Sequence, residues 1–151
     1  MNSSNMLSRQ GHRLLQIGVA MALFLSVEGF AIPYFAAPRL GLSVHTLSAL
    51  QSVLLLALGL VWPRLNLGAT ALRIAFWLLI YSTFAILAAY VMSAGWGAGN
   101  ETMPLAAGAA HGSPVQEAVI KSVAYSSAPT GLIAFAFILW GLRLANSRSR
   151  N

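Results

Sequence analysis

Apolar residues form four long stretches in this 151-residue chain, at about residues 14–35, 45–61, 71–94 and 116–142. A helix needs roughly 20 apolar residues to cross the hydrocarbon core of a bilayer, which is about 30 Å thick. Lipid offers no hydrogen-bond partner to free backbone groups, so such runs must be closed helices. The pattern therefore predicts an all-α protein with one domain over residues 1–151, an integral membrane four-helix bundle.

The composition agrees with a membrane protein and narrows the available chemistry. Hydrophobic residues make up 58% of the chain and charged residues 8%, against roughly 45–50% and about 25% in soluble domains. The chain contains no cysteine, which excludes disulfides, thiolate metal sites and cysteine nucleophiles. The first apolar run is too long for a removable signal peptide, and residues 26–30 lack a small-residue cleavage pattern.

The charges predict an orientation. The formal net charge is +6, and the basic residues lie at the ends of apolar runs, which favours a membrane surface over nucleic acid as the partner. On the predicted topology seven basic residues share one side: Arg9, Arg13, Arg64, Arg73, Arg143, Arg148 and Arg150. Only Arg39 and Lys121 lie on the other. The positive-inside rule then places both termini in the cytoplasm, and we expect the polar tails, residues 1–8 and 146–151, to be disordered.

The connection over residues 95–115 is long, rich in Gly and Ala, and interrupted by Pro104 and Pro114. Loops longer than about 12–15 residues are usually functional or disordered. This one is apolar enough to fold back over the helices, so we expect a functional loop.

Four polar residues interrupt the second apolar run: His45, Ser48, Gln51 and Ser52. At helical spacing they fall within an arc of about 120°, which we expect to face the bundle or a neighbouring subunit. Two interpretations of His45 remain open. It is either an axial heme or metal ligand, or an interfacial histidine at the helix start, and spacing alone favours the second.

Glu28 is a carboxyl group well inside the first apolar run. Ionisable side chains in a membrane are costly and indicate function by default. Two interpretations are open here as well. Glu28 is either buried and acts as a general acid or base, or it lies near the outer interface and pairs with Arg39.

Three aromatic residues of the third run, Trp77, Tyr81 and Phe84, share one helical face. Such a face suits an aromatic substrate or a flat macrocycle, although aromatic packing in a helical core gives the same pattern and is commoner. The chain contains no GxSxG, P-loop, HExxH or CxxCH motif. Any chemistry must therefore come from isolated side chains or from a cofactor.

Beyond these patterns, the chain resembles the bacterial hydroxylaminobenzene mutases over nearly its whole length after about Ser8. Many of the shared motifs lie in loops and are not dictated by hydropathy. The full set of shared motifs is Phe30–Pro33, Pro38–Ser43 followed by His45, Gly59–Pro63, Leu65–Leu67, Ile74–Trp77, Trp96–Gly99, Met103–Pro104, Ala106–Gly108, Gln116–Ala118 and Leu139–Arg143. A more distant resemblance, to the membrane-bound styrene oxide isomerases, covers the region of His12 and the second run.

The resemblance implies a multi-pass isomerase of the bacterial inner membrane. It would convert an N-hydroxylarylamine into an ortho-aminophenol without an external reductant. The styrene oxide isomerases are homotrimeric bundles that bind heme b through a histidine at the start of the second span, and the matching residue here is His45. A ridge of small residues favours close helix contacts in such an assembly: Gly18, Ala22 and Ser26.

The resemblance also implies a Lewis-acid mechanism, in which a heme held by His45 polarises the N–O bond. Trp77 and Phe84 would contact the cofactor or the charged arylamine. Gln51 would position the migrating oxygen, and Glu28 or Tyr81 would carry the ring proton.

Four positions depart from the pattern expected of the relatives. Gln51 stands where they typically have Asn, Phe84-Ala85-Ile86 replaces a Tyr-Ala-Asn triplet, and Glu28 replaces a small or hydroxyl residue. Two alternatives therefore stay open: a heme-dependent epoxide isomerase, and a catalytically silent heme-binding paralogue.

Overall fold

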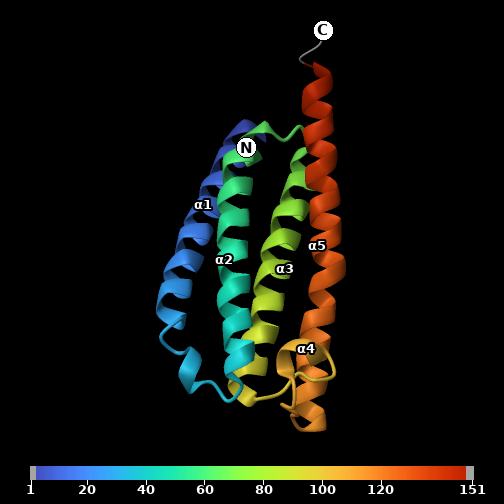
Figure 1. Ribbon diagram of the computed structural model, residues 1–151. Helices are drawn as coiled ribbons and strands as arrows, with labels where there is room; N and C mark the ends of the chain where they lie inside the picture. The colour runs from blue at the N-terminus through green and yellow to red at the C-terminus, as the bar shows by residue number, and fades with distance from the viewer. Residues whose placement is uncertain (1–2, 149–151) are drawn as a thin grey trace.

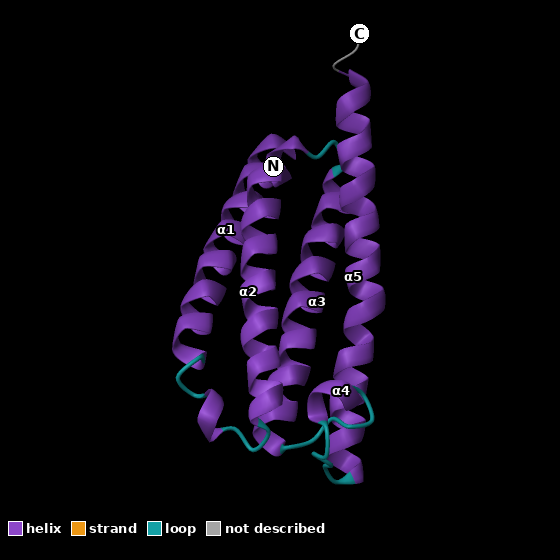
Figure 2. Ribbon diagram, viewed as in Figure 1, coloured by secondary structure: helices purple, strands orange, loops and turns teal. Residues whose placement is uncertain are grey.

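The computed structural model describes residues 3–148, and every regular element in that range is a helix (Figure 2). Four helices are long: α1 (Ser3–Glu28), α2 (Pro38–Val61), α3 (Ala69–Trp96) and α5 (Pro114–Arg148). The short elements are η1 (Ile32–Tyr34), η2 (Trp62–Arg64) and α4 (Pro104–Ala107). The all-α prediction is confirmed for this part of the chain.

The long helices lie side by side in the order α1, α2, α3, α5 (Figure 1). The middle helix α2 packs against α1 on one side and α3 on the other, and α3 packs most extensively against α5. Over residues 3–148, α1 and α5 share at most marginal contact. A single chain thus forms an open layer of helices, and a closed four-helix bundle is not confirmed.

Glycines allow α1 and α2 to approach closely. A Cβ atom on Gly18 would lie 2.8 Å from Leu56 Cγ, and one on Gly59 would lie 2.9 Å from Leu15 Cγ. The Ser52 hydroxyl donates a hydrogen bond of 2.8 Å to the Gly18 carbonyl. The predicted ridge of small residues therefore contacts α2 of the same chain at Gly18.

A buried tryptophan ties three elements together at the end where α1 begins. Trp62 is fully buried, and its Nε1 donates a hydrogen bond of 3.1 Å to Gln10 Oε1 on α1. Its ring packs edge to face against Phe76 of α3, with ring centroids 6.1 Å apart. This geometry is a favourable one for aromatic pairs and fixes η2 between α1 and α3.

The helix boundaries differ from the predicted ones. The first helix ends at Glu28, not near residue 35, because Gly29 and the proline of η1, Pro33, interrupt it. The second helix already begins at Pro38, since proline is favoured in the first helical turn. Helices also reach into both tails, so the expected disorder is wrong for residues 3–8 and 146–148, whereas residues 1–2 and 149–151 lie outside the described range.

Within the described residues, three helices are long and apolar enough to cross a membrane: Pro38–Arg64, Ala69–Trp96 and Pro114–Arg143. The helix α1, predicted as a further span, is less apolar because Gln10, His12, Arg13 and Gln16 occupy its first half. Large apolar side chains, including Leu23, Leu50 and Leu132, are exposed along the long helices. Such a surface fits a lipid environment.

The connection between α3 and α5 folds back against the helices, as its composition predicts, with α4 in contact with α2 (Figure 1). The buried carboxylate of Glu117 holds it. That carboxylate accepts hydrogen bonds from the backbone N–H groups of Gly99 at 2.8 Å, Gly112 at 3.0 Å and Glu101 at 3.3 Å. One side chain of α5 thus anchors three points of the loop.

Candidate functional site

The polar residues of α2 point to two different neighbours. Gln51 faces α3, where its Nε2 donates a hydrogen bond of 3.2 Å to the Thr83 carbonyl. His45 and Ser52 face α1, through contacts with Glu28 and the Gly18 carbonyl respectively. The polar stripe is therefore turned towards neighbouring helices, as its composition predicts.

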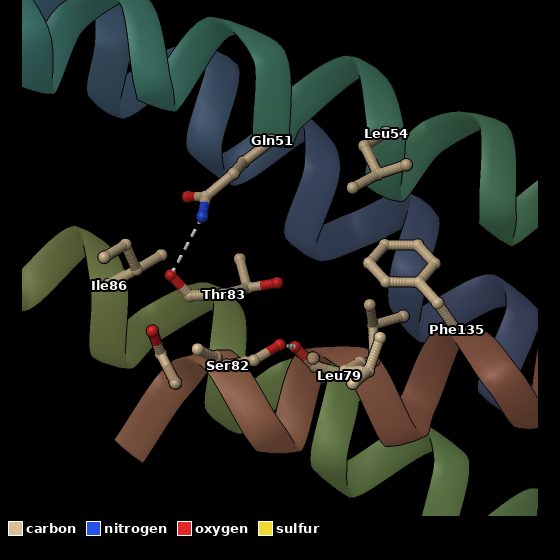
Figure 3. A pocket seen from close by; sticks show the side chains of 11 residues that line it. Gln51, Leu54, Leu79, Ser82, Thr83, Ile86 and Phe135 are labelled. Carbon is tan, nitrogen blue, oxygen red and sulfur yellow. Dashed lines mark hydrogen bonds between the residues drawn. The ribbon is translucent and has the colours of Figure 1, made fainter. Parts of the chain in front are cut away.

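Gln51 borders a cleft of about 420 Å³ between α2, α3 and α5 (Figure 3). The hydroxyls of Ser82 and Ser127 bond to carbonyls of their own helices, so they offer the cleft little free hydrogen-bonding capacity. Gln51 Oε1 is buried and has no hydrogen-bond partner in the described chain. The remaining lining is mostly apolar: Leu54, Leu79, Thr83, Ile86, Ala128, Gly131, Leu132 and Phe135.

This cleft can hold a small aromatic molecule. Ligand sites are typically apolar, with a few polar groups that fix orientation. The Oε1 atom of Gln51 has no partner in the described chain, and because it is buried it would accept a hydrogen bond from a ligand's N–H or O–H group once the side chain turns into the cleft. An aromatic amine or hydroxylamine combines those features.

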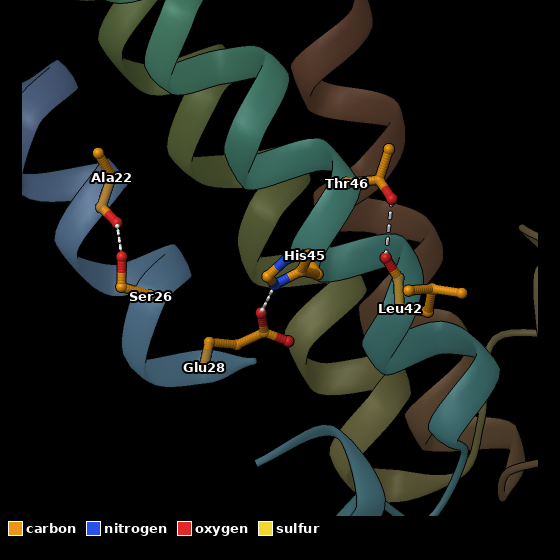
Figure 4. Close-up of polar contacts among 6 residues, drawn as sticks. All are labelled: Ala22, Ser26, Glu28, Leu42, His45 and Thr46. Carbon is orange, nitrogen blue, oxygen red and sulfur yellow. Dashed lines mark hydrogen bonds and ion pairs between the residues drawn. The ribbon is translucent and has the colours of Figure 1, made fainter. Parts of the chain in front are cut away.

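The second element of the site is a contact between Glu28 and His45 (Figure 4). Glu28 is the last residue of α1, and His45 lies in the second turn of α2. The Glu28 Oε2 atom lies 3.1 Å from His45 Nδ1. The Glu28 side chain is only 3% exposed, whereas that of His45 is 38% exposed.

This contact identifies the partner of Glu28, whereas its role as a general acid or base stays a prediction. Glu28 is buried, but it is not unpaired, and its partner is His45 rather than Arg39. The turn through η1 brings the start of α2 back against the end of α1, which places His45 opposite Glu28. Arg39 is exposed near the beginning of α2.

The contact leaves one nitrogen of His45 available. Nδ1 is engaged by the carboxylate, whereas Nε2 makes no hydrogen bond within residues 3–148. Gly29 lets the ring approach α1, because a Cβ atom there would lie 3.2 Å from His45 Cε1. A neutral imidazole that donates from Nδ1 carries its lone pair on Nε2, the form that binds metals.

His45 and Gln51 are six residues apart on α2, which corresponds to about 9 Å along the helix axis. They do not line the same cavity, since Gln51 borders the cleft and His45 does not. Between them, the hydroxyl of Ser48 is buried without a partner. One helix therefore carries both groups, separated by less than two turns.

The aromatic residues of α3 lie elsewhere. Trp77, Tyr81 and Phe84 are all exposed, and none of them lines the Gln51 cleft. The Tyr81 hydroxyl shares a hydrogen bond of 2.8 Å with Ser126 Oγ on α5. Phe84 borders an apolar groove of about 430 Å³ between α1 and α3. The structure thus does not gather the three rings around a cavity within one chain.

The other histidines are separated from this region. His12 is exposed in the first half of α1, and His111 is exposed in the loop before α5. Within residues 3–148 no group of three or more His, Asp or Glu side chains is placed to hold a metal ion. Any metal bound at His45 would therefore have to arrive with most of its own ligands.

Glu117 of α5 anchors the loop, a role that the sequence patterns did not single out. It follows a capping box at the start of α5, in which Ser113 and Gln116 exchange hydrogen bonds of 2.8 Å and 3.3 Å. The sequence signal for this role is an acidic residue directly after a capping box that follows a Gly-rich segment.

Comparison with known proteins assigns the family. The sequence profile of the styrene oxide isomerase family matches residues 10–143. Hydroxylaminobenzene mutase HabB of Ectopseudomonas oleovorans is 43% identical over 136 residues, which cover 90% of this chain and 83% of that protein. Hydroxylaminobenzene mutase HabA of the same organism is 33% identical over 129 residues, 85% of this chain and 96% of that protein. No solved structure matches. The chain is therefore an isomerase that belongs to the styrene oxide isomerase family.

Proposed function

We propose that this protein is a membrane mutase that rearranges an N-hydroxylarylamine of the hydroxylaminobenzene type to an ortho-aminophenol. In this reaction the N–O bond breaks and a C–O bond forms at the ortho carbon. That carbon loses a proton and the nitrogen gains one, so no oxidant or reductant is consumed. Two relatives named as hydroxylaminobenzene mutases, similar over most of both chains, support the assignment.

The structural observation that carries the proposal is the arrangement of His45. Its Nδ1 is held by a buried carboxylate, its Nε2 is free in the described chain, and its ring is partly exposed. Heme b needs only one axial ligand from the protein, so a single well-oriented histidine fits this cofactor. His45 would hold the iron. When bound, the heme would supply a Lewis acid that polarises the N–O bond.

The cleft beside Gln51 offers the other features that the reaction requires, and because His45 does not line it, a neighbouring copy of the chain would have to bring the cleft and the heme together. Gln51 Oε1 accepts a hydrogen bond from the substrate hydroxylamino group and orients it. The apolar walls exclude water, which would otherwise capture a cationic arylamine. Tyr81, which shares a hydrogen bond with Ser126, lies outside the cleft of one chain, so it would carry the ring proton only where a neighbouring copy brings a substrate against it.

We propose that the working form is a homotrimer. The helices of one chain form an open layer, and both His45 and the aromatic face of α3 with Trp77 and Phe84 are exposed. A second copy of the chain would cover these surfaces and enclose the cofactor. A native mass measurement in mild detergent tests this, since heme-bound monomers alone would contradict it.

We also propose four membrane spans, with both termini in the cytoplasm of the bacterial inner membrane. The beginnings of α1 and α3 and the ends of α2 and α5 lie at one end of the molecule (Figure 1). That end carries Arg9, Arg13, Arg64, Arg73 and Arg143. Such a charge distribution supports this orientation.

The test of function is turnover by the purified protein. With phenylhydroxylamine we expect 2-aminophenol as the product, without added reductant, and Gln51→Leu should slow its formation. Styrene oxide serves as the competing substrate. Conversion of styrene oxide with no reaction of phenylhydroxylamine would overturn the proposal and favour an epoxide isomerase.

A further inference from the structure

We propose that Glu28 is the positioning residue of His45. Its carboxylate accepts the Nδ1–H of the imidazole, fixes the tautomer that leaves the Nε2 lone pair free, and strengthens electron donation from that nitrogen to iron. The inference rests on the heme proposed above and adds a residue of α1 that none of the proposed steps uses.

The geometry supports this role in three ways. The contact between Glu28 Oε2 and His45 Nδ1 measures 3.1 Å, within the range of a hydrogen bond. The carboxylate is 3% exposed, so water does not compete for it. Its other oxygen, Oε1, is buried without a partner in the described chain, so His45 is the donor that stabilises this carboxylate.

The local structure of α1 gives no other reason for a carboxylate at this position. Glu28 is the last residue of the helix, where the helix dipole presents its negative end and disfavours an anion. Burial adds a desolvation cost. Glu28 is unfavourable for α1 and pairs with one side chain. We therefore attribute its presence to His45.

The same geometry argues against Glu28 as the carrier of the ring proton. Glu28 lies on α1 and faces His45, whereas the cleft is formed by α2, α3 and α5. A carboxylate that contacts neither the cleft nor Gln51 is not placed to reach a substrate there. Its influence must pass through the imidazole.

Outer-shell partners of metal-ligating histidines typically contribute 10–100-fold to metal affinity or activity. In Glu28→Leu the imidazole loses its acceptor, and we expect heme affinity to fall 10–100-fold. In Glu28→Gln the amide oxygen still accepts the hydrogen bond but the negative charge is gone. The Gln variant should retain heme, with the ferric–ferrous equilibrium shifted on the order of tenfold towards the ferrous state, which corresponds to about +59 mV for one electron.

The experiment compares purified wild type, Glu28→Gln, Glu28→Leu and a matched control, Glu101→Gln. Glu101 is an exposed acidic residue at the same end of the molecule, paired with Lys121 at 3.7 Å. Its substitution removes the same charge without touching His45. The measured quantities are heme content, reduction potential and the iron–histidine stretching frequency of the ferrous protein.

We expect the potential to rise in the order wild type, Glu28→Gln, Glu28→Leu, with the stretching frequency falling in that order and Glu101→Gln unchanged. A merely structural tie between α1 and α2 would lower the unfolding temperature of the Glu28 variants and leave potential and frequency at wild-type values, which overturns the inference. Wild-type protein that binds no heme would overturn both this inference and the proposed cofactor.

Discussion

Two buried oxygens on α2, Gln51 Oε1 and Ser48 Oγ, have no hydrogen-bond partner in the described chain. An unsatisfied buried polar atom costs about 1–3 kcal/mol. Gln51 borders a cleft of substrate size, so a ligand that donates a hydrogen bond would offset its cost. Ser48 lines no such cleft. We therefore expect a bound ligand to supply the hydrogen-bond donor that Gln51 Oε1 lacks.

This interpretation predicts that Gln51→Leu lowers activity with little effect on stability. Leucine removes the orphaned oxygen but also the hydrogen bond from Nε2 to the Thr83 carbonyl, so we expect the free energy of unfolding to change by less than about 1 kcal/mol. Loss of one substrate hydrogen bond should lower kcat/KM for phenylhydroxylamine about tenfold. Thermal unfolding in detergent and steady-state kinetics measure the two effects. The control, Gln51→Asn, keeps an amide and should retain most turnover; full activity in Gln51→Leu would refute the role.

The sequence singled out Glu28 and His45 but did not show that they pair, and the one partner it suggested for Glu28 was Arg39. Hydropathy shows that a carboxylate lies in an apolar run, but it does not show which side chain a later turn brings against it. The path from Gly29 through η1 into α2 decides this, and it places the second turn of α2 next to Glu28. The polar stripe of α2 was predictable because helical spacing alone defines it.

At the scale of elements, α1 and α2 make a close contact through glycines. Gly18 faces Leu56 at a distance that leaves no space for a side chain. The spacing of small residues on α1 predicted a close helix contact. The sequence did not show which helix would be the partner, and the structure identifies it as α2. Helix ends were less predictable, because Pro33 interrupts a run whose hydropathy continues to residue 35.

The α1–α2 contact predicts a clear difference between two glycine substitutions. In Gly18→Ala the new Cβ would lie 2.8 Å from Leu56 Cγ and 3.1 Å from its backbone nitrogen, so we expect a loss of about 1–3 kcal/mol in stability. The control is Gly95→Ala on α3, where a Cβ meets nothing within 4 Å. Alanine there should stabilise the helix by about 0.5–1 kcal/mol. Equal unfolding temperatures for both variants would contradict the packing.

The Glu117 contacts predict that this side chain keeps the loop folded. In Glu117→Ala three backbone donors lose their acceptor, and we expect a loss of about 2–3 kcal/mol in stability. Limited proteolysis within residues 97–113 should become faster. Glu101→Gln removes an exposed acid nearby and should leave cleavage unchanged. Equal protection of the loop in both variants would show that α4 docks without Glu117.

At the scale of the whole molecule, the ends of the helix layer differ in charge. Within the described residues, six arginines lie where α1 and α3 begin and α2 and α5 end, and Arg39 and Lys121 lie at the opposite end (Figure 1). The sequence predicted this division because apolar runs and basic residues alternate along the chain. It did not predict an open layer, because the pairing of helices depends on which faces carry small residues.

The orientation is tested with reporter fusions. A periplasm-active reporter at the C-terminus should be inactive, and a fluorescent protein that folds only in the cytoplasm should be bright there, because the positive-inside rule keeps the basic end inside. The control is the periplasmic reporter inserted at Ala109 in the loop, where it should be active. An active periplasmic reporter at the C-terminus of the intact chain would reverse the topology.

The central claim is that His45 holds the heme of an isomerase. The most direct measurement is the absorption spectrum of protein purified in detergent, for wild type and for three single alanine variants of the histidines. We expect the Soret band and the turnover of phenylhydroxylamine to disappear in His45→Ala, because no other described residue near Glu28 offers a free imidazole nitrogen. His12→Ala and His111→Ala should retain the band. A normal Soret band in His45→Ala together with its loss in His12→Ala would contradict the account.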